Sequence, residues 1–535
     1  MTPPIDAEEP TMPDAGGTAA IDEPQAQPSR AWLVLVGLTL LFVVLRLPVI
    51  QRQIPAQDED YFAVPGWTIL EDGLPRIPYM PVRDPESAFY RTDEILFALP
   101  PLYFYWEAFF YGLLGPSTPV ARFSSLVAGV IATWILYRLG RVFLTDGRAA
   151  CWAAGLYLFS RIVYFPAVMT RPDMLCGALG LAAILATWRY TQTQRLSLAV
   201  VSGLLVGLGG LTHPFALVFG MQCGVWILLA GGTWLRRLLA AVLYSLAGAA
   251  MVALWLPLIL KAPDAFQAQF FNNVLGRAGP GLTSRLLWPW ESVAAQVPLF
   301  FEHAGPIQAA LMLLGAVGVA VIAWRQRDAG LRTLALLIWS GIYLHMACQG
   351  THPTKGYWCY TGALMFLGVG VVIREGLRLL ESRPVMVRQV AASLLGLVLA
   401  GLLVPGGGLR TVVAHLQHWS DINYDAPRFT QQLLEELPQH GEFVVDPGYV
   451  FEFYLSGRST VLALNFPFFF DVTGRPYDVL VAGPYSIRDG VPDALGAQFV
   501  RSYGDREDLF ACFAELYRAP QTDILPAPTG DASSP

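Results

Sequence analysis

The chain has 535 residues, of which 54% are hydrophobic and 14% are charged, with a formal net charge of -6. Soluble domains carry about 25% charged residues, so this composition, with a mean hydropathy of +0.46, excludes an ordinary soluble protein and indicates a membrane protein. The six cysteines show no CxxC or His/Cys spacing of a zinc module. No basic stripe with interleaved aromatic residues is present, so a nucleic-acid partner is not expected.

The first 29 residues predict a disordered cytoplasmic tail. They hold six acidic residues and no basic one among many Pro, Ala and Gly, a composition that cannot bury a core. A signal peptide is not predicted, because no basic region precedes the first apolar run, which starts only at Ala31. The last residues, 521–535, are also expected to be disordered.

Eleven apolar segments are predicted to cross a membrane, since a spanning helix needs about 20 mostly apolar residues. They cover residues 31–50, 119–138, 149–167, 174–188, 196–212, 214–231, 237–260, 306–324, 331–347, 360–373 and 390–405. With the N-terminus in the cytoplasm, each of the five short cytoplasmic connections carries at least two arginines. This distribution follows the positive-inside rule and predicts the orientation of the whole transmembrane domain, residues 30–405.

One more apolar stretch, residues 96–114, is predicted not to cross the membrane. Counting it as a twelfth span would place the later arginine clusters on the external side. The Pro100-Pro101 break and the aromatic residues from Tyr103 to Phe110 are typical of the headgroup region. We therefore expect an interfacial or re-entrant helix inside an external loop over 51–118.

Residues 406–520 predict a small α/β domain on the external, periplasmic face. A helix is expected over 427–437, where Leu and Phe residues share one face. Short strands bounded by Gly and Pro are expected over 442–446, 459–464 and 477–482. A second helix is expected over 505–518, because acidic residues begin this segment and Arg518 ends it, as the helix dipole favours.

Polar motifs that suit chemistry fall in the loops of the predicted external face. The first is Asp58-Glu59-Asp60-Tyr61, directly after the first span, and the second is Arg171-Pro172-Asp173. The third runs from His352 through Lys355 and Tyr357 to Tyr360, and a weaker fourth is His213. Their common placement on one face predicts a shared site.

Each motif also has a purely structural interpretation. Three acidic residues in a row can form a solvated loop, and Asp173 can stabilise the start of its helix. Lys355 can extend to the headgroups from an aromatic belt. Lys355 is nevertheless notable, because Lys261 is the one other lysine of the chain.

Four short motifs resemble the GT-C glycosyltransferase superfamily. They are Asp58-Glu59 with Tyr61, Leu99-Pro100-Pro101-Leu102-Tyr103, Ala121-Arg122-Phe123-Ser124-Ser125 and Arg171-Pro172-Asp173. Their order and spacing over about 30–405 look like the lipid A aminoarabinose transferase and the bacterial relatives of protein O-mannosyltransferases. The first of these branches has a lysine before its Pro-Pro pair, where this chain has Leu99, which argues against that exact substrate.

The resemblance implies a mostly α-helical protein of a bacterial inner membrane. It would transfer a sugar from a polyprenyl-phosphate carrier to a lipid, glycan or protein acceptor on the external face, with inversion of the anomeric centre. Membrane lipids would surround it. Whether it uses a divalent metal is left open, since some relatives use one and no complete metal site is visible here.

The motifs then take predicted roles. Asp58 is the predicted general base, with Glu59 orienting it, because an acceptor hydroxyl loses a proton as it attacks. Cations and hydroxyls would stabilise the leaving phosphate, and the residues predicted for this role are Lys355, Arg171, Tyr357 and Tyr360. The sugar or the acceptor would be positioned by Asp60, Tyr61, Asp173, His213 and His352.

Two other functional classes stay open at this level. A transporter or flippase is one, although that class usually places ionisable groups near the bilayer midplane. A non-catalytic membrane scaffold with a partner-binding external domain is the other. A disulfide between Cys348 and Cys359, on either side of the Lys355 loop, is a further hypothesis for an oxidising face.

Overall fold

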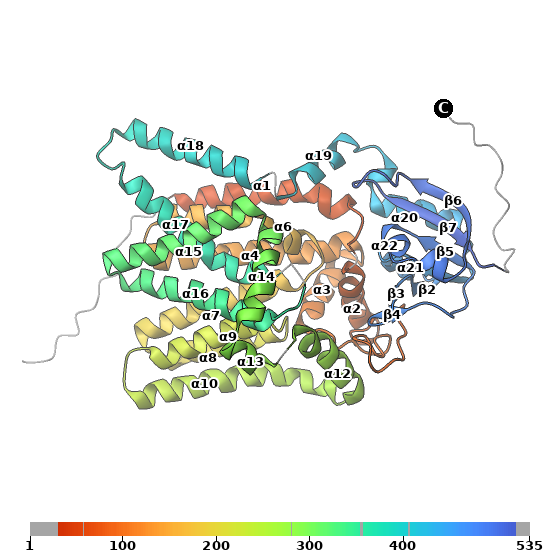
Figure 1. The fold of residues 1–535 in the computed structure, drawn as a ribbon, viewed down its shortest axis with the longest axis horizontal. Coiled ribbons are helices and arrows are strands. Elements are labelled where there is room, and N and C mark those ends of the chain that lie inside the picture. The colour runs from red at the N-terminus through yellow and green to blue at the C-terminus, as the bar shows by residue number, and fades with distance from the viewer. Residues whose placement is uncertain (1–29, 57, 280, 354–356, 405–406, 521–535) are drawn as a thin grey trace, which may run out of the picture.

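The computed structural model describes residues 30–56, 58–279, 281–353, 357–404 and 407–520. Within them, a bundle of apolar helices carries a small α/β domain at one end (Figure 1). The predicted Lys355 and both predicted tails lie outside the described residues. The expected fold class, a mostly helical membrane protein with a small C-terminal α/β domain, is confirmed.

Eight described helices are long and apolar enough to cross a membrane by length and composition. They are α1 (Ala31–Arg52), α4 (Thr118–Leu144), α7 (Asp173–Thr193), α10 (Trp234–Val252, continuing to Ile259), α15 (Pro306–Gln326), α16 (Ala329–Gln349), α17 (Trp358–Arg378) and α18 (Val385–Leu403). A ninth span would be the pair α5 (Gly147–Leu158) and α6 (Arg161–Val168), bent by 60°.

The remaining two predicted spans are the shorter apolar helices α8 (Leu196–Gly210) and α9 (Ala216–Leu229). At about 1.5 Å per residue they are each little more than 20 Å long, less than the roughly 30 Å of a bilayer core. Every predicted apolar segment is therefore helical, while the count of eleven crossings stays a prediction.

Small residues let the helices approach closely. A Cβ atom added to Gly203 of α8 would lie 2.1 Å from the carbonyl oxygen of Tyr244 on α10. A Cβ atom added to Gly207 would lie 2.4 Å from the carbonyl oxygen of Gly248. Without a hydrophobic force between helices in lipid, such backbone contact is a main source of helix association. It gives the bundle the rigidity to hold loops at its end.

Shorter helices cover the end of the bundle that carries the α/β domain. They are α2 (Glu59–Asp72), α3 (Leu102–Leu114), α11 (Leu256–Ile259), α12 (Pro263–Phe270), α13 (Leu282–Leu287) and α14 (Trp290–Ala304). Helix α3, inside the stretch predicted to be interfacial, has 13 residues and is thus about 20 Å long, too short to span a bilayer. Tyr105, Phe109 and Leu113 on its outer face are exposed.

The C-terminal domain contains a five-stranded sheet in the order β2-β1-β5-β7-β6. Its strands are β1 (Glu442–Val445), β2 (Ser459–Leu462), β5 (Val479–Ala482), β6 (Gln498–Gly504) and β7 (Phe513–Arg518), and a hairpin adds β3 (Asn465–Phe466) and β4 (Phe470–Asp471). Strand β1 is parallel to β2 and β5, whereas β7 is antiparallel to β5 and β6. Its helices are α19 (Leu409–Gln417), α20 (Ala426–Glu436), α21 (Val450–Leu455), α22 (Pro484–Arg488) and α23 (Val491–Ala494).

The helix predicted over 505–518 is wrong, because Phe513–Arg518 forms strand β7. The acidic residues that suggested a helix start are turn residues: Asp505 Oδ1 accepts the Glu507 amide at 2.9 Å, and Asp508 Oδ1 accepts the Phe510 amide at 2.8 Å. Pairing of β7 with a strand on each side outweighs the local charge pattern.

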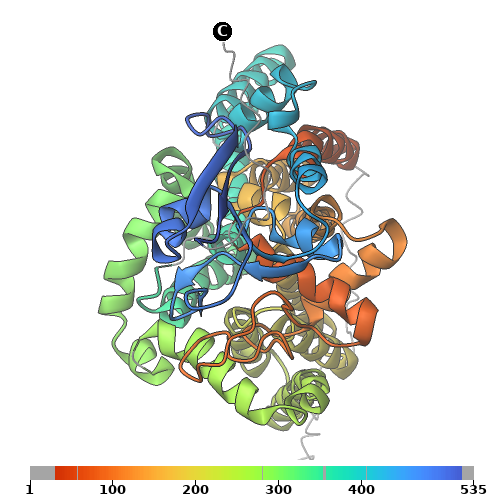
Figure 2. The same cartoon turned by 90° about the vertical axis from the view of Figure 1, so that its right-hand side faces the viewer.

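The domain is fixed to the end of the bundle by polar contacts. Ser87 Oγ donates to the carbonyl oxygens of Phe469 and Phe468 at 2.7 and 3.1 Å, and the Leu462 amide donates to Tyr79 O at 2.9 Å. Viewed from that end, the sheet lies over the helices and the loop before α3 (Figure 2). The domain therefore covers this end of the bundle and helps to enclose the space between them.

Candidate active site

A cavity of about 670 Å³ lies where the end of the bundle meets the C-terminal domain. Its walls come from the start of α2, the loops around residues 98, 171 and 213, the segments 270–278 and 282–285, residues 348–352 with Tyr357, the β3–β4 hairpin and the end of α22. Of the predicted site residues, those that line it are Asp58, Tyr61, Arg171, His213, His352 and Tyr357. The loops predicted to share one face are thus at one end of the bundle.

Asp58 and Asp173 are joined through one arginine. Arg171 Nη1 lies 2.5 Å from Asp58 Oδ2, and Arg171 Nε lies 2.7 Å from Asp173 Oδ2. Asp173 also accepts a hydrogen bond from the Tyr360 hydroxyl at 2.9 Å. Asp173 and Tyr360 are fully buried behind the cavity wall, whereas the Asp58 side chain is 51% exposed. Asp58 therefore presents a carboxylate to the cavity from a rigid, buried support.

Glu59 does not reach the cavity and belongs to a buried ion pair with Arg122. Its carboxylate binds Arg122 at 2.8 and 2.7 Å and accepts the amides of Thr170 and Ala56 at 2.9 and 2.8 Å. Arg122 holds the pKa of this carboxyl below its usual range despite burial, which by itself would raise it. Glu59 thus ties the start of α2 to α4 and to the loop that carries Arg171.

Asp60 and Tyr61 differ in their access to the cavity. The Asp60 carboxyl is buried, Oδ1 accepts the Tyr61 amide at 2.9 Å, and Oδ2 has no hydrogen-bond partner among the described residues. Burial, reinforced by the charge of Asp58, raises the pKa of Asp60 well above its usual value, so a neutral carboxylic acid is expected there. Tyr61 lines the cavity beside Phe89, with ring centroids 4.9 Å apart.

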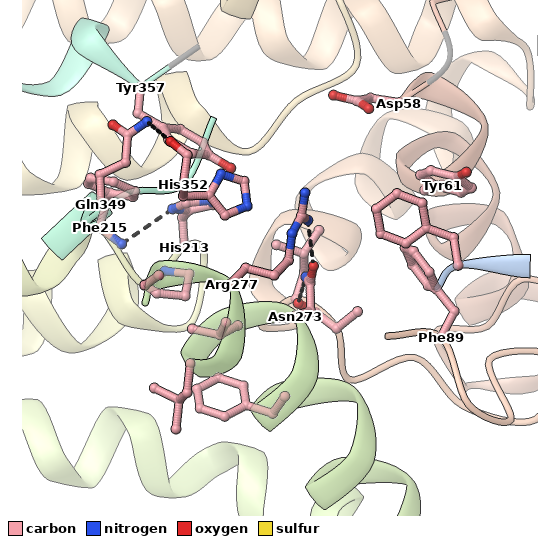
Figure 3. Close-up of a pocket in the computed structure, with 18 of the residues that line it drawn as sticks. Asp58, Tyr61, Phe89, His213, Phe215, Asn273, Arg277, Gln349, His352 and Tyr357 are labelled. Carbon is pink, nitrogen blue, oxygen red and sulfur yellow. Dashed lines mark hydrogen bonds between the residues drawn. The ribbon is translucent and has the colours of Figure 1, made fainter. Parts of the chain in front are cut away.

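The opposite wall is aromatic (Figure 3). His213 stacks near Phe215 and Tyr357, with ring centroids 5.5 and 5.1 Å away. Burial lowers the pKa of His213 to about 4, although Asp173 opposes this effect, and burial also lowers the pKa of His352 to about 4. Both imidazoles are therefore neutral at pH 7 and can act as hydrogen-bonding groups but not as cations.

Arg277, which the sequence did not indicate, extends into the middle of the cavity (Figure 3). Its guanidinium donates to Asn273 Oδ1 at 2.9 Å and lies 5.3 Å from the ring centroid of Phe469, but it pairs with no described carboxylate. It follows a turn of π-helix, Phe271–Leu275, a feature often found at functional sites. The sequence did hold one signal for Arg277: it is an arginine near glycines in a loop of the predicted external face, which has few basic residues.

Arg285 is the second cation of the cavity wall that was not predicted. Its Nη1 donates to the carbonyl oxygens of Cys348 and Ala278 at 3.0 and 3.2 Å. Cys348 is a free thiol, so the disulfide considered with Cys359 is not formed. Among the residues that the structure describes, no group of three or more His, Cys, Asp or Glu could hold a metal ion.

Comparison with known proteins shows which fold the chain has. The family model described as dolichyl-phosphate-mannose-protein mannosyltransferase matches residues 98–260. No protein of curated function matches the sequence at a significant level.

Three solved structures are similar at low sequence identity. ArnT from Cupriavidus metallidurans bound to undecaprenyl phosphate has a TM-score of 0.59 and 16% identity, covering 91% of this chain and 98% of that one. The apo state of the same protein has a TM-score of 0.57, 14% identity and the same coverage. The apo oligosaccharyltransferase of Archaeoglobus fulgidus has a TM-score of 0.51 and 14% identity, covering 93% of this chain and 75% of that one. The resemblance expected from the sequence is thus confirmed at the level of fold: this chain is a multi-pass membrane protein with the GT-C glycosyltransferase fold.

Proposed function

We propose that this protein transfers a sugar from a polyprenyl-phosphate carrier to an acceptor hydroxyl, with Asp58 as the general base, at the periplasmic face of a bacterial inner membrane. The observation that carries this proposal is one cavity containing a half-exposed carboxylate, Asp58, and a cation, Arg277, that has no carboxylate partner among the described residues. These are the two groups that transfer from a phosphate leaving group requires.

The part of the cavity around Arg277 suits the lipid carrier. Apolar side chains of the segment 270–285 line it, namely Phe270, Val274, Leu275 and Leu282. Exposed Phe271, Leu275 and Leu287 continue this apolar character to the outer surface of the same segment. A lipid tail can therefore lie along 270–287 while its phosphate meets Arg277. The relative crystallised with undecaprenyl phosphate supports this choice of carrier.

Arg277 is a better phosphate-binding group than Arg171. Arg171 is already bound to two carboxylates and is 4% exposed, so an incoming phosphate would compete with both. Arg277 makes one neutral hydrogen bond in the structure and can form charge-assisted bonds that strengthen as the leaving phosphate gains charge. Burial lowers the pKa of Arg277, and the nearby Tyr357 and Asp58 both oppose this effect.

The reaction then follows from the placement of the two groups. The acceptor oxygen bonds to the anomeric carbon as the bond from that carbon to the phosphate oxygen breaks, with its electron pair leaving on the phosphate. The acceptor proton passes to Asp58. Figure 3 shows the Arg277 guanidinium in the middle of the cavity and Asp58 to one side of it, so an acceptor activated by Asp58 would attack on the side away from the phosphate, with inversion.

The position of the site argues against a transporter. The candidate residues lie at one end of the bundle and partly on the C-terminal domain, whereas transporters bind substrate near the bilayer midplane. The arginine-rich short loops lie at the other end, which supports the periplasmic orientation of the cavity.

The test is mass spectrometry of envelope glycolipids and glycoproteins from cells with the wild-type protein, without it, and with Asp58→Asn. We expect a sugar-modified species that is lost without the protein and falls at least about 100-fold with Asp58→Asn, as removal of a general base predicts. Glu86→Gln, an exposed acid in the same external loop, should leave the species unchanged. Near-normal product with Asp58→Asn would exclude Asp58 as the base.

A further inference from the structure

The corner of the cavity next to Asp58 is built from both domains. Tyr61 of α2, Phe89 of the first external loop and Phe469 of the β3–β4 hairpin all line it. The ring centroids of Phe89 and Phe469 are 5.5 Å apart, and those of Tyr61 and Phe469 are 6.4 Å apart. Ser87 fixes the hairpin to the loop through the Phe469 carbonyl, so the three rings form a stable wall.

The hydroxyl of Tyr61 in this corner lacks a partner. Tyr61 is 8% exposed, and its hydroxyl makes no hydrogen bond with any described residue. The hydroxyl oxygen is buried in the structure, and leaving it unpaired is costly, so a hydrogen bond to a bound acceptor would relieve that cost. Burial raises the pKa of Tyr61 well above its usual value, and the charges of Asp60, Asp58 and Asp489 add to the effect. The phenol is therefore protonated and can donate.

The end of α22 adds a charged pair to the same cavity. Arg488 Nε donates to Asp489 Oδ1 at 3.0 Å, and both residues line the cavity. A carboxylate beside a guanidinium offers both an acceptor and a donor to the hydroxyl groups of a ligand. Together with the aromatic wall, it supplies both an apolar face and polar edges.

This corner lies on the acceptor side of the reaction. Figure 3 shows Tyr61 and Phe89 on the same side of Arg277 as Asp58, whereas His213, His352 and Tyr357 lie on the other side. If the phosphate meets Arg277 and the base is Asp58, the acceptor must approach from the Asp58 side. The C-terminal domain therefore contacts the acceptor, through Phe469 and the Arg488–Asp489 pair.

We infer that this corner binds a sugar ring of the acceptor, so that the protein glycosylates a glycan, with Tyr61 and Asp489 as acceptor-binding residues. The inference rests on the proposed function. A pyranose presents an apolar face of C–H groups, which suits the Tyr61–Phe89–Phe469 wall, and a rim of hydroxyls, which suits Tyr61 and the charged pair. A peptide backbone lacks the rim of hydroxyls, and phosphoethanolamine and phosphoglycerol headgroups lack the apolar ring face.

The test combines two measurements on Tyr61→Phe and Asp489→Asn. The first is the amount and identity of the envelope product by mass spectrometry. The second is binding of undecaprenyl phosphate to the purified full-length protein by native mass spectrometry. We expect the sugar to be attached to a glycan hydroxyl, the product to fall about tenfold in each variant, and undecaprenyl phosphate binding to stay within about twofold of wild type. Tyr61→Phe keeps the ring and removes a buried oxygen that has no described partner, so thermal stability should stay the same or rise.

Asp493→Asn is the matched control, because Asp493 is an exposed acid five residues from Arg488. Attachment of the sugar to a protein or to a phospholipid without a glycan would overturn the inference. So would normal product in both variants, or an equal loss of product and undecaprenyl phosphate binding. If cells with and without the protein give the same envelope species, the proposed function itself fails, and the inference fails with it.

Discussion

Arg171 Nη1 lies 2.5 Å from Oδ2 of Asp58, and the same guanidinium binds the buried Asp173. Asp58 is thus oriented by a cation that is itself held in place, while its carboxylate remains half exposed to the cavity. This contact joins two loops that are 113 residues apart in the chain. The arrangement makes Arg171 a positioning residue for the proposed base.

Replacing Arg171 by Lys tests this positioning role. Lysine keeps the charge but cannot bind both carboxylates with a planar fork, so we expect kcat to fall about tenfold or more while undecaprenyl phosphate binding is retained. Turnover assays and native mass spectrometry measure the two quantities. Arg428→Lys, at an exposed site on the C-terminal domain, is the control. A parallel loss of phosphate binding would instead restore the phosphate-binding role predicted for Arg171 from sequence.

Arg277→Gln should weaken undecaprenyl phosphate binding. A hydrogen bond to a charged group contributes about 1.5–3 kcal/mol, which corresponds to about a 10- to 100-fold increase in Kd. Titration of the purified protein with undecaprenyl phosphate measures this change. Arg506→Gln, an exposed arginine of the C-terminal domain, should leave Kd unchanged. An unchanged Kd in Arg277→Gln would place the phosphate elsewhere, with Arg285 as the next described cation of the wall.

Glu59→Gln should destabilise the protein. The substitution leaves Arg122, which is 2% exposed, without its counter-charge, and breaking a buried pair costs about 3–5 kcal/mol. Thermal unfolding should therefore begin at a clearly lower temperature than in wild type. The double variant Glu59→Gln with Arg122→Gln should recover part of the loss, because no unpaired charge stays buried. A stable Glu59→Gln variant with slow turnover would show that Glu59 acts in the chemistry.

Gly350→Ala should displace the segment that carries Arg277. Gly350 has φ +62°, and an added Cβ would lie 2.0 Å from the carbonyl oxygen of Ala278. Gly457 has φ +78° with nothing within 4 Å of its Cβ position, so Gly457→Ala carries the backbone strain without the clash. We expect weaker undecaprenyl phosphate binding in Gly350→Ala alone. Equal binding in the two variants would show that this contact does not position Arg277.

Stability should fall as the pH drops from about 6.5 to about 4. Burial lowers the pKa values of His213, His352 and His415 to about 4 from a usual value of 6.5. In this window the unfolded chain binds more protons than the folded one. The contribution of these histidines to the free energy of unfolding is therefore fully present above pH 6.5 and is lost as the pH falls to about 4. Thermal unfolding from pH 7.5 to 4 measures the slope. His213→Asn should reduce it, and an unchanged slope in that variant would show that His213 does not contribute.

Local patterns in the sequence were sufficient to predict the apolar helices and three strands of the C-terminal domain, while the number of membrane crossings stays a prediction. Long apolar runs must form helices in a bilayer, because every backbone polar group there needs an internal partner. Short apolar runs bounded by Gly and Pro at 442–446, 459–464 and 477–482 became β1, β2 and β5. The helix expected over 505–518 was wrong because its charges indicate only the local turn, whereas β7 is fixed by pairing with β6 before it and with the more distant β5.

The sequence by itself determined that polar motifs such as Asp58-Glu59 and Arg171-Pro172-Asp173 share one end of the helices, since span count and arginine placement decide that. Only the tertiary structure decided their roles. Adjacent residues at the start of α2 point in different directions, so Asp58, just before the helix, lines the cavity while Glu59, its first residue, binds Arg122. Arg277 and Asp489 reach the same cavity from distant segments. An arginine near glycines was the one sign for Arg277, and Asp489 had none, because such proximity depends on how helices and sheet pack over long distances along the chain.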